Sequence, residues 1–186
     1  MMKDMFKRAW GIITSGNATW DRIAEERKPV SAIRKQYIYP WIILCVVLVF
    51  LFDTLYASER SIEKGILSVI VTSLSMLGGY FISNILCFLY LKKYQAELAS
   101  KVESETIVAY SYTIIILLEI LIAIIPSLFF LRILSMFVGY MVWEGCRAMW
   151  KLKEDERGNI VLIFSIIIIF IPIIISRIIH MMLPNA

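Results

Sequence analysis

The sequence predicts an all-α membrane protein with five transmembrane helices and an amphipathic N-terminal segment. Two observations predict this class. Hydrophobic residues make up 60% of the 186 residues and charged residues only 18%, and the apolar residues form long continuous runs. A soluble domain is usually nearer half apolar and a quarter charged. A chain this short could not bury so much apolar surface in its own core, so the expected solvent for most of it is lipid.

The apolar runs follow a charged segment, residues 1–37, and define a bundle over 38–186. One run, 107–143, would make a helix of about 55 Å, although a bilayer core is only about 30 Å thick. Proline lacks a backbone donor and disfavours helix at the residue before it, so Pro126 predicts a tight hairpin within this run. A single kinked, tilted span is the alternative. With the hairpin, the predicted spans are about 38–56, 66–91, 106–125, 128–149 and 160–182.

The distribution of basic residues predicts the orientation. Of the 19 Lys/Arg residues, 15 fall in the N-terminal segment and in the loops at 92–105 and 147–158, which five spans place on one side. Loops rich in Lys and Arg favour the cytoplasm. We therefore expect an integral plasma (inner) membrane protein with a cytoplasmic N-terminus and the tail Leu183–Ala186 outside. Four spans would turn the last helix against the charge of the 147–158 loop.

The N-terminal segment has an interfacial amphipathic pattern. Phe6 and Trp10 fall on one helical face, opposite Lys3 and Lys7, and Trp20 follows in a second short helix. Such a segment lies in the membrane interface with its apolar face in the lipid. The three aromatic residues are therefore predicted to be interfacial anchors. A membrane-lying sensor or a partner-docking element is the alternative.

Ionisable side chains within the predicted spans form the first candidate site. They are costly in a bilayer and tend to be functional. At a rise of about 1.5 Å per residue, two acids and two bases from four spans reach similar depths in the outer half: Asp53, Glu119, Arg132 and Arg177. We predict an intramembrane polar cluster with His180 at its outer edge. Alternatively, the arginines and Asp53 snorkel separately to the surface, while mid-span Glu119 faces other helices or a wet cavity.

A second polar set is expected near the inner boundary, where the same counting places Asn84, Glu144 and Arg147. Glu144 and Arg147 are three residues apart on one predicted helix, and residues at this spacing are neighbours on the helix surface. The alternative is therefore that these two residues pair only with each other.

Small residues at four-residue intervals predict helix packing. Ser75, Gly79 and Ser83 follow this spacing in the second predicted span, and Ser135 and Gly139 in the fourth. Small side chains on one face let two helix backbones approach closely in a membrane. We interpret both groups as packing seams, and a substrate path is the alternative.

The sequence predicts no enzyme, cofactor or metal site. His180 is the only histidine, so a multi-histidine metal site is excluded. Cys45, Cys87 and Cys146 lie in or beside apolar runs without metal-binding spacing. No phosphate-binding loop, zinc-protease motif or nucleophile elbow is present. The basic residues are mixed with acids and no nucleic-acid module is visible, so no nucleic-acid partner is expected.

Three segments carry a resemblance to a known family. They are Trp10–Ile13 continuing through Ser15–Trp20 to Ile23, then Val108-Ala109-Tyr110-Ser111, and Gly139-Tyr140 with Gly145. Together they resemble the Yip domain family, the Ypt/Rab-interacting membrane proteins, and in particular its short prokaryotic members. The resemblance spans nearly the whole chain and implies a five-helix bundle with a cytoplasmic N-terminus.

The resemblance also implies functions, from which this chain departs. Eukaryotic relatives are linked to Rab GTPases, vesicle budding and membrane shaping. This chain has no long cytoplasmic domain and no Asp-Leu-Tyr motif before its first span. Tyr112-Thr113 stands where a proline commonly follows the Tyr-Ser motif. We therefore do not carry GTPase binding over to it.

The predicted function is that of a non-enzymatic integral membrane protein. It would organise the bilayer, other membrane proteins or a homo-oligomer through helix contacts and its basic amphipathic N-terminus. The alternative is a small transporter or channel component with an ion or proton path along the intramembrane charges. A dry, sealed cluster would favour the first function and a water-accessible cavity reaching Glu119 the second. A lipid-handling protein would need a lateral opening.

Overall fold

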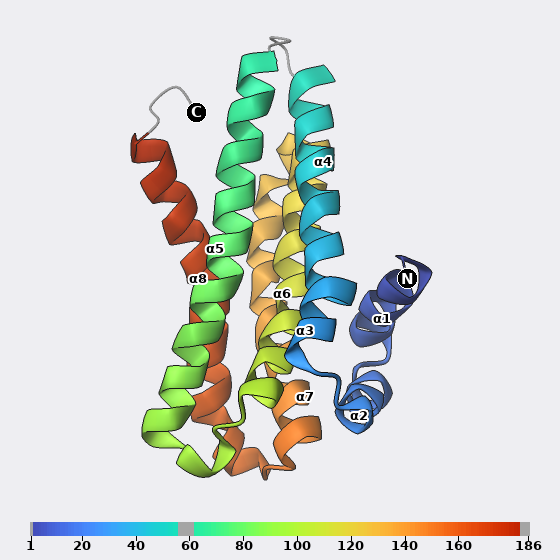
Figure 1. Ribbon diagram of the computed structural model, residues 1–186, viewed down its shortest axis with the longest axis vertical. Coiled ribbons are helices and arrows are strands. Elements are labelled where there is room, and N and C mark those ends of the chain that lie inside the picture. Colours follow the sequence, from blue (N-terminus) through green and yellow to red (C-terminus); the bar gives the residue numbers. More distant parts are fainter. Residues whose placement is uncertain (1, 56–61, 183–186) are drawn as a thin grey trace.

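The computed structural model describes residues 2–55 and 62–182, and every regular element in them is a helix (Figure 1). The predicted outer loop at 57–65 lies largely outside these residues, and the tail Leu183–Ala186 wholly outside. The elements are α1 (Met2–Thr14), α2 (Gly16–Glu26), α3 (Val30–Ile33), η1 (Arg34–Ile38), α4 (Tyr39–Leu55), α5 (Ile62–Tyr94), η2 (Ala96–Leu98), α6 (Lys101–Ile124), η3 (Pro126–Met136), α7 (Phe137–Trp150) and α8 (Glu154–Met182).

Five helical stretches are long and apolar enough to cross a membrane, which confirms the predicted fold class. They are Val30–Thr54, Ile62–Tyr94, Lys101–Ile124, Pro126–Trp150 and Glu154–Met182. α6 is the central helix: it contacts α4, α5 and α7, and every residue from Ser104 to Ile114 is buried. α4 packs on α5, α5 packs on α8, and α7 lies against both α6 and α8.

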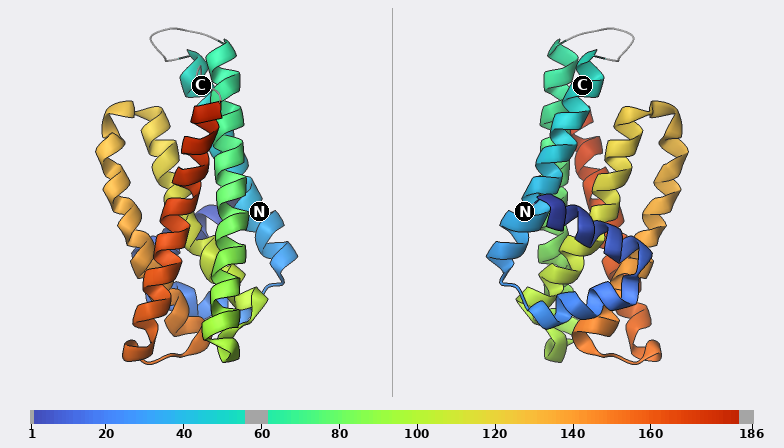
Figure 2. Two further views of the ribbon diagram at one scale, coloured as in Figure 1. Left: turned by 90° about the vertical axis from the view of Figure 1, so that its left-hand side faces the viewer. Right: turned by 90° about the vertical axis from the view of Figure 1, so that its right-hand side faces the viewer.

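Pro126 reverses the chain, as predicted. Ile125 has φ −133° and ψ 89°, outside the helical region, because the proline ring disfavours helix at the preceding residue. The chain returns as η3, a 3₁₀ helix, and continues as α7. None of the 11 residues of η3 is buried. Figure 2 shows the hairpin of α6, η3 and α7 leaning away from α5 and α8 at the Pro126 end.

The first span begins at Val30 rather than at residue 38. Pro40 suggested a helix start there because proline has no backbone N–H. Instead, η1 is a π turn in which the Tyr39 N–H donates to the Arg34 carbonyl, five residues back. A wider turn accommodates the missing donor, and the helix continues through Pro40. Residues 30–37 are therefore part of the bundle.

The third span begins at Lys101 rather than at residue 106. The Ser100 side chain caps it by accepting a hydrogen bond from the Glu103 N–H at 3.4 Å. A serine followed three residues later by glutamate is a known signature of a helix start. This earlier start places Glu105 inside the bundle.

Candidate functional site

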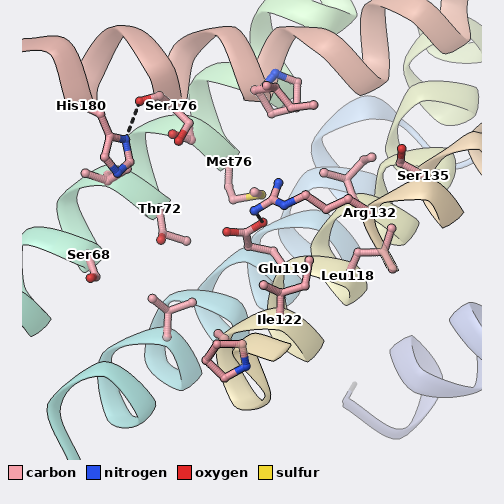
Figure 3. A pocket seen from close by; sticks show the side chains of 18 of the residues that line it. Ser68, Thr72, Met76, Leu118, Glu119, Ile122, Arg132, Ser135, Ser176 and His180 are labelled. Carbon is pink, nitrogen blue, oxygen red and sulfur yellow. Dashed lines mark hydrogen bonds and ion pairs between the residues drawn. The ribbon is translucent and has the colours of Figure 1, made fainter. Parts of the chain in front are cut away.

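A cavity of about 410 Å³ lies among α4, α5, α6, η3 and α8, toward the Pro126 end of the bundle (Figure 3). Asp53, Glu119, Arg132 and His180, four residues of the predicted cluster, line it. Arg132 Nη2 donates to Glu119 Oε2 at 3.2 Å, and their side chains are 55% and 27% exposed. His180 Nδ1 lies 2.7 Å from the Ser176 carbonyl oxygen. The structure thus brings an acid and a base together in an accessible cavity.

The predicted cluster is corrected at Arg177, which is exposed and does not line the cavity. Ser176 and His180 are four residues apart on α8 and share the face that lines the cavity. Arg177 is rotated by about 100° from Ser176 around the helix. Counting residues gave its depth in the membrane, but the direction of a side chain depends on rotation about the helix axis.

Next to the cavity, a buried tyrosine is hydrogen-bonded to the backbone of α5. Met76 lines the cavity, and its carbonyl oxygen accepts a hydrogen bond from the buried Tyr112 hydroxyl at 3.1 Å. Tyr112 lies seven residues before Glu119, about 10 Å along α6. On α5 the cavity lining ends at Met76. Among the described residues, the lining does not include Tyr112.

A second charged site, which the sequence did not predict, lies elsewhere in the bundle and joins three helices. The Glu105 side chain on α6 is 0% exposed and forms an ion pair with the Arg34 Nε on η1. Arg34 Nη2 donates to the second Glu105 oxygen at 2.8 Å, and the Tyr80 hydroxyl of α5 donates to Glu105 at 2.7 Å. The Arg34 guanidinium also lies 5.1 Å from the centre of the Phe81 ring. Both oxygens of this buried carboxylate therefore accept hydrogen bonds, two of which come from the charged guanidinium.

Sequence analysis missed this pair because it assigned both residues to the regions flanking the spans. Arg34 and Glu105 are 71 residues apart; Arg34 was placed in the N-terminal segment 1–37 and Glu105 in the loop 92–105. The cap formed by Ser100 and Glu103 was the available signal, since it extends the third span back past Glu105. No comparable signal in the sequence identifies Arg34 as the partner.

The residues that carried the family resemblance meet where α2 docks on α6 and α7. Trp20 is buried, and its ring centroid lies 5.9 Å from that of Tyr110. A Cβ at Gly145 would lie 3.1 Å from the Trp20 ring, and one at Gly16 only 2.6 Å from the Tyr140 hydroxyl. These two glycines therefore permit the close approach. Trp20 is a packing residue within the bundle, which corrects its predicted role as an interfacial anchor.

Polar contacts hold α2 in this position. Arg147 Nε donates to Glu144 at 2.8 Å, while its Nη2 pairs with Asp21 at 2.9 Å and donates to the Asn17 carbonyl oxygen at 3.1 Å. The Asn17 amide nitrogen, in the orientation that the hydrogen-bond network favours, donates to Glu144 at 2.7 Å. Glu144 and Arg147 thus pair with each other and also with α2. Asn84 is buried on α5, and no hydrogen bond among the described residues joins it to this set.

Helix α1 is fixed to α2 by an ion pair. Arg8 Nη2 donates to both carboxylate oxygens of Glu26, at 2.8 and 2.7 Å. Burial of the guanidinium opposes its charge, but the hydrogen bonds and electrostatic interactions with Glu26 and Tyr110 together outweigh this effect, so the pKa of Arg8 is raised. Arg8 therefore remains charged, and α1 and α2 form one docked helical hairpin, which we call the N-terminal hairpin (residues 2–26).

Helix α1 has two apolar faces. The face buried against the bundle consists of Met5, Ala9 and Ile12. The exposed face consists of Phe6, Trp10 and Ile13. The Phe6 ring makes an edge contact with Trp41 of α4, at 4.9 Å between centroids, whereas Trp10 is 70% exposed. The exposed apolar face of α1 therefore points away from the bundle, next to the first span.

The predicted small-residue seam on α5 lies against α8. A Cβ at Gly79 would lie 2.8 Å and 3.0 Å from Cβ and Cα of Pro172, and 2.5 Å from the Tyr112 hydroxyl. The Ser83 hydroxyl donates to the Ile167 carbonyl oxygen of α8 at 3.3 Å. Gly79 thus allows α5 and α8 to touch near the proline of α8. Ser75, one turn further along, lines the cavity.

The shorter seam predicted on the fourth span is much looser. Ser135 lines the cavity, and a Cβ at Gly139 would meet Ser165 of α8 at an ordinary 3.6 Å. Gly139 is therefore not required for close packing. Tight packing in this part of the bundle is concentrated at Gly79.

Among the described residues, no group of three or more His, Cys, Asp or Glu side chains could hold a metal ion.

Comparison with known proteins identifies the family. No curated protein matches the chain, and no solved structure matches it. The family model described as the Yip1 domain matches residues 10–176, nearly the whole chain and all three segments that carried the resemblance. The protein is therefore an integral membrane protein that belongs to the Yip1 domain family.

Proposed function

We propose that this protein organises the membrane around it through the docked N-terminal hairpin, with its N-terminus on the cytoplasmic side. The exposed face of α1, centred on Trp10, is the observation that supports this function. Because Arg8–Glu26 and the Arg147 contacts fix the hairpin to the bundle, the apolar face enters lipid at a set position. A helix inserted on one side only acts as a wedge in that leaflet.

The residues of α1 provide both the apolar and the electrostatic part of an interaction with the membrane interface. Fully burying an aromatic side chain contributes about 1.5–3 kcal/mol, and Trp10 and Phe6 both present surface to the lipid. Lys3 and Lys7 are exposed on the same helix, and each basic residue near an anionic surface contributes about 1 kcal/mol. The hairpin therefore favours anionic, loosely packed membrane.

Replacing Phe6 and Trp10 with alanine is expected to weaken the preference of the protein for highly curved membrane. The full-length protein, reconstituted into vesicles of mixed diameter that contain anionic lipid, should accumulate in the small vesicles, because its wedge fits their packing defects. In the double variant we expect at least half of this enrichment to be lost. Single-vesicle fluorescence, comparing protein density with diameter, measures it.

The matched control is Phe129→Ala/Phe130→Ala, which removes two exposed aromatic rings from η3, away from the N-terminal hairpin. This control should retain the wild-type preference. Equal enrichment for the wild type and the Phe6/Trp10 variant would show that the hairpin does not shape or sense the membrane. A loss of equal size in both variants would point to a general effect of exposed aromatic surface.

A second candidate function, an ion or proton path, is favoured by the accessible carboxylate in the cavity. Glu105, Tyr112 and Glu119 follow one another at seven-residue intervals on α6, so they lie on one face of the helix. Intramembrane carboxylates are typical of proton relays. Tyr112, which stands between the two carboxylates, is fully buried, bonds to the Met76 carbonyl and does not line the cavity; for this reason we rank this function second.

This candidate predicts proton flux in sealed liposomes that is lost in Glu119→Gln. Glutamine keeps the shape of the side chain but cannot carry a proton through the carboxylate. Flux would be followed with an internal pH-sensitive dye under an imposed membrane potential, and Arg177→Gln, outside the cavity, is the control. No flux above that of protein-free liposomes would exclude the path.

A further inference from the structure

The cavity contains hydrogen-bonding groups that have no partner or have donors that are not used. Ser75 is 3% exposed, lines the cavity, and its hydroxyl has no hydrogen-bond partner among the described residues. Arginine carries five donors, and Arg132 uses only Nη2 in the contact with Glu119. Asp53 lines the same cavity and makes no ion pair with the described residues. A buried polar group without a partner is costly, and Ser75 is such a group; together with the unused donors of Arg132 and the Asp53 carboxylate in the same cavity, it indicates a bound ligand.

The charged side chains in the cavity favour a ligand that carries both a positive and a negative charge. Arg132 supplies one positive charge and five donors, which suit a phosphate. Asp53 and Glu119 supply acceptors for an ammonium group, which is a donor only. The volume of about 410 Å³ lies within the usual range of small-ligand sites, roughly 300–1,000 Å³. A phosphoethanolamine group combines these features.

The surroundings indicate that such a group belongs to a lipid. Arg132 on η3 and His180 on α8 are both exposed and line the cavity from its two sides. Exposed apolar side chains continue from them along the same helices, including Ile133 and Ile173. Acyl chains attached to a headgroup in the cavity would lie on this apolar surface.

We propose that the cavity binds the headgroup of a phosphatidylethanolamine-type lipid, with Arg132 on its phosphate, and Asp53 and Glu119 on its ammonium group. Ser75 donates to the phosphate from the wall of α5. The site lies away from the N-terminal hairpin, so it is independent of the function proposed above.

The test measures which lipids remain bound to the purified protein. The full chain is placed in nanodiscs containing equal amounts of phosphatidylethanolamine, phosphatidylcholine and phosphatidylglycerol. After transfer to detergent, native mass spectrometry identifies and quantifies the lipids that the protein retains. We expect the ethanolamine lipid to be retained preferentially, since trimethylammonium has no N–H to donate. Losing one charge-assisted hydrogen-bond partner should weaken retention at least about tenfold in Arg132→Gln and in Asp53→Asn.

Arg177→Gln is the matched control, because Arg177 is an exposed arginine of the same bundle that does not line the cavity. It should retain the wild-type lipid preference. Equal retention of the three lipids by the wild type would overturn the proposal, as would an equal loss in the control. Soluble phosphoethanolamine is the second arm: if it displaces the lipid at comparable concentration, the site recognises the free headgroup and the assignment to a lipid is wrong. The competition uses wild-type protein and so does not depend on the folding of any variant.

Discussion

Arg34→Met is expected to lower the free energy of unfolding by about 3–5 kcal/mol, because it leaves a buried carboxylate without its counter-ion. Glu105 is 0% exposed, and the Tyr80 hydroxyl would be its remaining donor from the site. Methionine has a similar length and keeps apolar contact with Phe81. Unfolding in mixed micelles, followed by tryptophan fluorescence as denaturing detergent is added, measures the change.

Two further variants separate the buried charge from other effects. The double variant Arg34→Met/Glu105→Met removes both charges and should recover most of the lost stability, since replacing a whole buried ion pair with apolar residues is often close to neutral. Arg132→Gln breaks an exposed pair and should cost no more than about 1 kcal/mol. If Arg34→Met and Arg132→Gln cost the same, the buried pair does not stabilise the bundle.

The second large effect is expected at the contact between α5 and α8. Gly79→Ala adds a Cβ that would lie 3.0 Å from the Pro172 Cα and 2.5 Å from the Tyr112 hydroxyl. Overpacking of this kind costs about 1–3 kcal/mol, and the Tyr112–Met76 hydrogen bond would be displaced as well. Gly79→Leu should cost more, because α5 and α8 must then separate. The same unfolding measurement detects both changes.

Gly158→Ala is the control for this series. Gly158 is also in a helix, α8, but a Cβ there would have no neighbour within 4 Å. Alanine favours helix over glycine by up to about 1 kcal/mol, so this variant should be neutral or slightly more stable. Gly79→Ala with a stability equal to that of Gly158→Ala would mean that the α5–α8 contact is not tight.

The bundle could be predicted from the sequence because its main determinants are local. The length of each apolar run and the position of Pro126 depend on residues that are adjacent in the chain, and the hairpin at Ile125 follows from the proline ring. The start of the first span was misplaced, since a proline such as Pro40 is typical of a helix start. The π turn that accommodates it is not visible in the residue pattern.

The sites were predicted less well because they depend on the rotation of helices and on distant partners. Counting residues placed Glu119 and Arg132 at matching depths, and the structure pairs them. The same counting included Arg177, which points away from the cavity. Trp20 was assigned to the interface from its amphipathic helix, whereas Gly145, 125 residues later, provides the space that buries it.

The 3₁₀ geometry of η3 affects how the fourth span meets a bilayer of given thickness. With a rise of about 2.0 Å per residue, its 11 residues cover about 22 Å, compared with about 16 Å for an α-helix. Winding this stretch into α-helix would shorten the fourth span by about 5 Å. No residue of η3 is fully buried, although Leu131 packs against the core, so such a change disturbs fewer core contacts than one in α6. Hydrophobic mismatch with a thinner membrane would therefore be relieved at η3 first.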